Sequence, residues 1–224
     1  MALLLGQALD GRELEKDTSA WSGERFANLC DGLVWAVSRK TRTAIPSFTF
    51  NTNAPDGGVD AECFADLPTA PGTLADMLIG GGWNVFQYKK RDVLASGRKK
   101  IVSGLKTQLK GALASLENKH GRVLSRYVLC VNVNLDHGEK DGLRLAIQDG
   151  FGRPDAVAIS ILGAQELAQL LNDNPHLRAA HFQPQDFRTW EAALDALGKN
   201  KFLGRNVVLQ GREDVLKRAT ALIE

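Results

Sequence analysis

Two short segments of the sequence place acidic, amide and basic side chains two residues apart. The first ends in Asp60-Ala-Glu62, and the second is Gln87-Tyr-Lys89. Side chains alternate between the two faces of a β-strand, so Asp60 and Glu62 would share one face of their strand. The same holds for Gln87 and Lys89. If the two strands pair, these polar groups meet on one surface of the sheet.

Such a cluster is costly to bury unless it binds something, because charged groups lose their hydration. A divalent cation is the partner that this set of side chains predicts. Asp60 would supply a hard oxygen ligand and Gln87 its side-chain carbonyl oxygen, with water and phosphate oxygens completing the shell of Mg²⁺ or Mn²⁺. The ammonium group of Lys89 would orient or help to deprotonate an attacking water and stabilise charge on the phosphate. The residues therefore predict phosphodiester hydrolysis.

The elements that must position these residues have the pattern of an α/β chain. Helical spacing of apolar residues predicts a helix from about Trp21 to Ser38. Turn residues at 53–58, between β-rich segments at 44–51 and 59–65, predict a hairpin. The remaining predicted elements are strands over 83–89, 127–133 and 156–162, and helices over 97–117, 140–148, 164–172 and 187–197. We expect a mixed sheet flanked by helices.

The motif resembles that of a known family. Gly57-Gly-Val-Asp60 followed by Gln87-Tyr-Lys89 is similar to the metal-binding Asp and the (Glu/Gln)-x-Lys motif of PD-(D/E)xK nucleases, especially the Mrr-type restriction endonucleases. The family usually has Asp or Glu where this chain has Gln87, and Gln is a variant found among Mrr-like members. Many members place a Glu on the first helix near the metal, and Glu24 is the position that matches.

The resemblance covers residues 21–133 and implies a restriction-endonuclease-like fold, an αβββαβ core with C-terminal βα additions. The wider chain, including segments 81–92 and 174–178, is similar to the amino-terminal nuclease module of bacterial antiviral STAND ATPases. That likeness implies a nuclease domain over residues 1–200, with 201–224 as a linker and the beginning of a further domain. It also implies double-stranded DNA as the partner, self-association of a longer parent chain, and no small-molecule cofactor.

Composition adds bounds on partners and compartment. Lys and Arg number 28 against 26 Asp and Glu, so the net charge of +2 provides no global attraction to nucleic acid. The three cysteines lack zinc-site spacing and cannot form a complete disulfide framework. The apolar opening is interrupted at Gly6 and Asp10, far short of the ~20 residues of a membrane span. We expect a soluble cytoplasmic protein without membrane attachment.

Other interpretations of these residues stay open. Asp60 and Lys89 could form a structural ion pair. An acidic residue such as Glu24 is favoured in the first turn of a helix by the helix dipole, and Glu62 could be a solvated carboxylate at a strand end. The basic face of the helix at 97–117 could be an ordinary solvated surface. The alternative function is a catalytically inactive nuclease-fold module that serves as a nucleic-acid or protein-binding adaptor.

Overall fold

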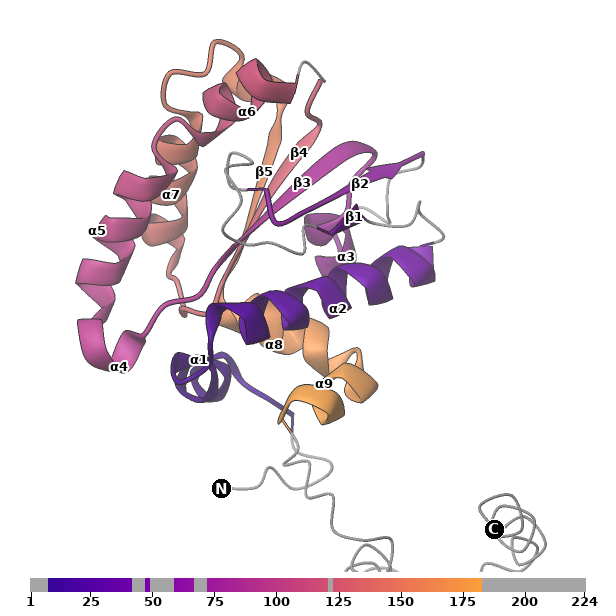
Figure 1. Cartoon of the computed structure of the whole chain (residues 1–224), viewed down its shortest axis with the longest axis vertical. Coiled ribbons are helices and arrows are strands. Elements are labelled where there is room, and N and C mark those ends of the chain that lie inside the picture. Colours follow the sequence, from indigo (N-terminus) through magenta and orange to yellow (C-terminus); the bar gives the residue numbers. More distant parts are fainter. Residues whose placement is uncertain (1–7, 42–46, 49–58, 67–71, 121–122, 183–224) are drawn as a thin grey trace, which may run out of the picture. The chain divides into compact units, whose positions relative to one another are not determined.

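One β-sheet with helices on both sides satisfies the apolar patterning of the chain (Figure 1). The computed structural model describes residues 8–41, 47–48, 59–66, 72–120 and 123–182. The strands are β1 (Ser47–Phe48), β2 (Ala61–Ala65), β3 (Gly82–Lys89), β4 (Arg126–Val131) and β5 (Ala158–Leu162). The helices are α1 (Gly11–Ser19), α2 (Gly23–Thr41), α3 (Leu74–Leu78), α4 (Val93–Ser96), α5 (Arg98–Leu109), α6 (Ala112–His120), α7 (His137–Gln148), α8 (Ala164–Asn172) and α9 (Pro175–Phe182), with a 3-10 turn at Pro154–Ala156. The predicted α/β class and its mixed sheet flanked by helices are confirmed.

The five strands lie in the order β1-β2-β3-β4-β5. Strands β1, β2 and β3 are antiparallel neighbours, whereas β3, β4 and β5 are parallel. The parallel pairs need crossover connections. Helices α4, α5 and α6 connect β3 to β4, and α7 connects β4 to β5. The central strands β3 and β4 are buried along almost their whole length.

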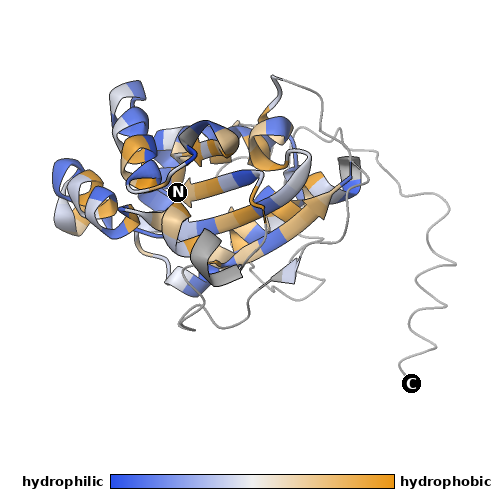
Figure 2. Ribbon diagram, turned by 90° about the horizontal axis from the view of Figure 1, so that it is seen from above, coloured by the Kyte–Doolittle hydropathy of each residue, from blue (hydrophilic) through white to orange (hydrophobic). Residues whose placement is uncertain are grey.

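Each face of the sheet has its own apolar core, and the alternation of side chains along the strands divides them (Figure 2). On one face, Phe86 and Val128 pack with residues of α2 and α8. On the other face, Val85 and Leu129 pack with residues of α5, α6 and α7. Below, these are the α2 face and the α5 face.

The helix predicted over 97–117 is two helices in the structure. The chain leaves α5 at Lys110, and Gly111 has φ 72°, a left-handed conformation in which an L side chain is strained. The Gly111 amide donates a hydrogen bond to the Ala146 carbonyl of α7 at 3.0 Å. This tertiary contact replaces the hydrogen bond that would have continued the helix.

Four described helices were not expected from periodicity: α1, α3, α4 and α9. The other predicted elements are present with ends shifted by a few residues, and α8 has the predicted bounds. The hairpin turn at 53–58 and the predicted helix at 187–197 lie outside the described residues, as does the predicted domain boundary at 200. Contacts group residues 1–183 into one unit. None of the described helices is long and apolar enough to cross a membrane.

Candidate metal-binding active site

Asp60 lies in the bend that leads into β2, and its hydrogen bonds connect this bend to β3. Its amide donates to the Phe86 carbonyl at 2.9 Å, and its Oδ2 accepts from the Tyr88 amide at 2.7 Å. The side chain thus takes over a hydrogen bond that a strand carbonyl would otherwise accept. Its half-buried carboxylate is held beside the β3 backbone, close to the plane of the sheet.

The register of β2 and β3 places three of the predicted polar residues on one face. The register ends at Ala61 opposite Phe86, and the Asp60 amide bonds to the same Phe86 carbonyl, so Asp60 lies in a bend just outside the strand pairing. By alternation, Glu62, Gln87 and Lys89 belong to the α5 face. Glu62 lies furthest from Lys89 in this register, and its Oε2 accepts a hydrogen bond from the Trp83 indole at 2.9 Å.

Gln87 is buried and its side-chain oxygen is already oriented. The Tyr127 hydroxyl on β4 donates to Gln87 Oε1. Burial, and then the charge of Asp60, raise the pKa of Tyr127, so the phenol stays protonated and remains a donor. A carbonyl oxygen has two lone pairs, so Gln87 Oε1 can accept from Tyr127 and bind a cation. Tyr127 would then fix the direction of that ligand, as outer-shell partners commonly do.

Asp31 on α2 is a candidate that the sequence reasoning missed. Burial, reinforced by the charge of Asp60, raises the pKa of Asp31 to about 6. Its Oδ1 is buried and has no hydrogen-bond partner among the described residues. Asp60 thus affects both Asp31 on the α2 side and Tyr127 on the α5 side, consistent with a carboxylate close to the sheet plane. The only signal in the sequence is an acidic residue bordering the apolar stripe of a helix.

The structure places Glu24 apart from this group. Glu24 is exposed in the first turn of α2, where the helix dipole stabilises its negative charge. It precedes Asp31 by seven residues, which corresponds to about 10 Å along the helix axis. Of the two acidic residues on α2, Asp31 is therefore the one that neighbours Asp60.

Buried thiols surround the α2 side of the site. Cys30 contacts Cys130, and burial raises the pKa of Cys30 well above its usual value, so this thiol is neutral. Neutral thiols are poor metal ligands. Within the described part of the chain, no group of three or more His, Cys, Asp or Glu side chains is arranged to hold a metal ion. A cation beside Gln87 would rest on the carboxylate of Asp60 and this amide oxygen.

Such a donor set fits Mg²⁺ better than a transition metal. Mg²⁺ is usually bound through one or two carboxylates while water and substrate phosphate oxygens fill its other positions. Asp60 and Gln87 supply oxygen donors only. No known family model matches this chain, and no characterised protein sequence matches it.

Proposed function

We propose that this chain is a metal-dependent endonuclease that hydrolyses phosphodiester bonds of double-stranded DNA. The observation that carries the proposal is the position of Asp60. Its carboxylate accepts a hydrogen bond from the Tyr88 amide, the residue between Gln87 and Lys89 on β3. The (Glu/Gln)-x-Lys spacing then puts Lys89 two residues along the same face of β3.

Each residue has a role that follows from its chemistry. Asp60 would hold Mg²⁺ together with the oxygen of Gln87. When bound, the ion would polarise the phosphate and lower the pKa of a coordinated water. Lys89 is half-buried on β3, and its ammonium would orient the attacking water and offset charge on the phosphate. Tyr127 would keep the Gln87 oxygen aimed at the ion.

We place this activity in the cytoplasm, as the effector domain of a larger antiviral defence protein. A single centre cuts one strand, so two cuts in a duplex require two centres or two visits. Self-association of the parent chain would supply the second centre and would serve as the activating step. This part of the proposal rests on the resemblance to the nuclease modules of STAND ATPases.

A second candidate function has support from the hydrogen bonds themselves. Asp60 Oδ2 accepts from the Tyr88 amide, Gln87 Oε1 from Tyr127, and Glu62 from Trp83. Each polar group thus already has a partner within the protein, which is what a structural role requires. A nuclease-fold module that binds nucleic acid without cutting it would keep these hydrogen bonds and need no cation.

Cleavage of supercoiled plasmid by the full 224-residue chain, over a range of protein concentrations with Mg²⁺ or EDTA, tests the proposal. We expect Mg²⁺-dependent nicking, reduced at least about 100-fold in Asp60→Asn and Lys89→Ala because each loses a group that contacts the ion or the reacting phosphate. Asp155→Asn and Lys99→Ala are the matched controls. Both positions are exposed, and both variants should cut like the wild type.

Two results would contradict the assignment. Equal cutting by wild type and Asp60→Asn at every protein concentration would remove the proposed site. Salt-dependent DNA binding with no Mg²⁺-dependent cutting, even at concentrations where the chain self-associates, would favour the adaptor.

A further inference from the structure

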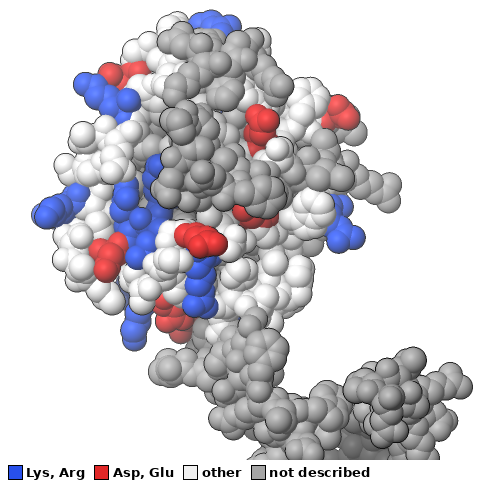
Figure 3. Space-filling model, viewed as in Figure 1, with Lys and Arg blue, Asp and Glu red and all other residues white. Residues whose placement is uncertain are grey.

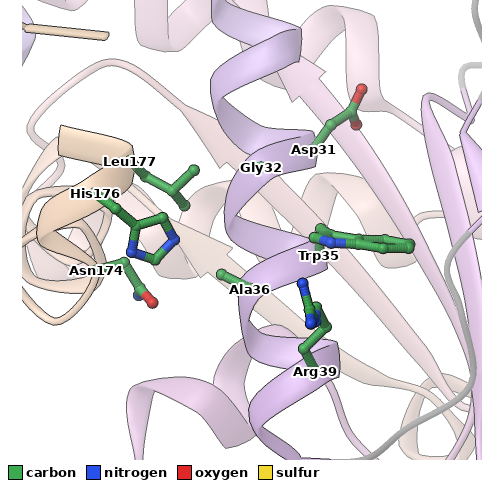
Figure 4. Close-up of a pocket in the computed structure, with 8 residues that line it drawn as sticks. All are labelled: Asp31, Gly32, Trp35, Ala36, Arg39, Asn174, His176 and Leu177. Carbon is green, nitrogen blue, oxygen red and sulfur yellow. The ribbon is translucent and has the colours of Figure 1, made fainter. Parts of the chain in front are cut away.

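A pocket of about 740 Å³ lies over α2 beside α9, next to the candidate metal site (Figure 4). Small residues of α2, Gly32 and Ala36, lie in the middle of its lining. Trp35 and Arg39 project to one side of α2, and residues at the beginning of α9 lie on the other. The volume is in the range of small-molecule sites, roughly 300–1,000 Å³.

The α2 side of the pocket presents three different chemistries in one row. Asp31, Trp35 and Arg39 recur every four residues, so they lie on one side of the helix over about 12 Å of its axis. Trp35 is 39% exposed, which is unusual for so large an apolar side chain and leaves part of the ring free for contact. The exposed guanidinium of Arg39 lies one turn beyond it.

The pocket also contains buried hydrogen-bond acceptors without donors. Asn174 is 1% exposed, and its amide nitrogen donates to the Leu170 carbonyl at 2.7 Å. Its Oδ1 has no hydrogen-bond partner among the described residues, and neither has Oδ1 of Asp31. An unpaired buried oxygen costs free energy, so such groups in a pocket are expected to meet a ligand that carries N–H groups.

We propose that this pocket binds a nucleoside phosphate. The base would stack on Trp35, an exocyclic amine would donate to the unpaired oxygen of Asn174, and the phosphate would meet Arg39. A flat ring, N–H donors and an anionic group within one small molecule match the three features of the lining. The proposal prefers amine-bearing bases, adenine and cytosine, over thymine, because thymine has no exocyclic amine.

Two sources could supply this ligand: a free nucleotide, or one nucleotide of a DNA strand. Asp31 lines the pocket and senses the charge of Asp60, so a strand whose phosphate lies at Asp60 could extend one base toward the pocket. Binding of a mononucleotide does not require cutting. It can therefore be measured whether or not the proposed nuclease activity exists.

The experiment is calorimetric titration of the full chain, in EDTA, with dAMP, dCMP, dTMP, deoxyadenosine, inorganic phosphate and a 12-nucleotide single strand. We expect saturable binding of dAMP and dCMP, weaker binding of dTMP, and about tenfold weaker binding of dAMP to Trp35→Ala, in line with measured base stacking on aromatic residues. Arg39→Ala should weaken dAMP at least about fivefold and leave deoxyadenosine unchanged, because only the former carries a phosphate. Arg12→Ala, at an exposed position on α1, is the matched control and should bind dAMP like the wild type.

A variant that fills the pocket provides a second test of where the ligand binds. Ala36→Leu occupies the middle of the lining and should abolish binding while the circular dichroism spectrum stays that of the wild type. Equal affinity of the oligonucleotide and dAMP would assign the pocket to free nucleotides, whereas an oligonucleotide that binds much more tightly and remains sensitive to Trp35→Ala would assign it to a strand. The proposal is overturned if no mononucleotide saturates the wild type, if phosphate alone competes as well as dAMP, or if folded Ala36→Leu and Trp35→Ala bind like the wild type.

Discussion

At the scale of single residues, the main finding is a carboxylate whose ionisation the fold opposes. Asp31 is held beside Asp60 and largely removed from water, and both effects favour its protonated form. Perturbed groups of this kind cluster at functional sites, although structural networks perturb pKa values too. Asp31 therefore makes a sharper probe of the site than the exposed Glu24.

The thermal stability of the protein should fall as pH rises through the titration of Asp31. Its pKa is about 6 in the folded chain and about 3.9 in an unfolded one. Between these values the folded state binds the proton more tightly, so this contribution is fully present below pH 4 and is lost by about pH 6. Asp31→Asn cannot lose a proton, so its melting temperature should decline less over that window.

Melting curves of wild type and Asp31→Asn, measured from pH 4 to 7 with and without Mg²⁺, test this expectation. Mg²⁺ at pH 7 should raise the melting temperature of the wild type more than that of Asp31→Asn, because a cation relieves the repulsion between the two carboxylates. Parallel curves for the two proteins across the whole pH range would show that Asp31 titrates normally.

At the scale of elements, tertiary contacts override local propensity where α5 ends. Apolar residues continue at helical spacing from α5 into α6, and Lys110-Gly111 alone interrupts them. The break lets both helices follow the curved surface of the α5 face and pack with α7. Basic side chains gather over α4 and α5, with acidic ones among them (Figure 3). Among these charged side chains, Arg98 on α5 donates two hydrogen bonds to the Glu139 carboxylate on α7, at 2.5 and 3.1 Å.

Two glycines near this break should respond to alanine with opposite signs. Gly111→Ala forces an L side chain to adopt φ 72° and should cost about 1–2 kcal/mol. Gly104→Ala, in the exposed interior of α5, meets no atom within 4 Å of the new Cβ and should stabilise the protein by about 0.5–1 kcal/mol. Urea unfolding of both variants gives the comparison. A Gly111→Ala protein as stable as wild type would mean that the two helices merge without penalty.

At the scale of the whole described unit, one sheet connects two cores. Strands β3 and β4 contribute side chains to both, Phe86 and Val128 to the α2 face and Val85 and Leu129 to the α5 face. If the helices on one face lost their packing, strands β3 and β4 would be exposed to water on that side. The core on the other face depends on the same two strands, so it would be disturbed as well. The site lies at the C-terminal end of the central strand β3, so its geometry depends on both cores.

Unfolding of this unit should therefore be cooperative. Leu33→Ala opens a cavity in the α2 core and Leu129→Ala opens one in the α5 core, and each should cost about 2–5 kcal/mol. In each variant, tryptophan fluorescence and far-ultraviolet circular dichroism should report one coincident transition. Separate transitions by the two probes in either variant would show that the faces unfold independently.

Periodicity and alternation were sufficient for most of the fold, and for the shared face of Gln87 and Lys89 on β3. The missed helix α1 had a readable signal, because Asp10 and Glu13 have the spacing of a capping box, and both hydrogen bonds of that box are present. Helix α9 is eight residues long, and none of its residues is buried, so it offered no apolar stripe to detect. Asp31 had no comparable signal.

The sequence by itself determined which elements form and which side chains share a strand face, because both follow from the local geometry of the backbone. Only the tertiary structure decided which strands pair, that α2 brings Asp31 rather than Glu24 to Asp60, and that a contact between Gly111 and α7 ends α5. These outcomes depend on groups far apart in the chain. Burial, charge repulsion and hydrogen bonding act between such groups only after the sheet has assembled.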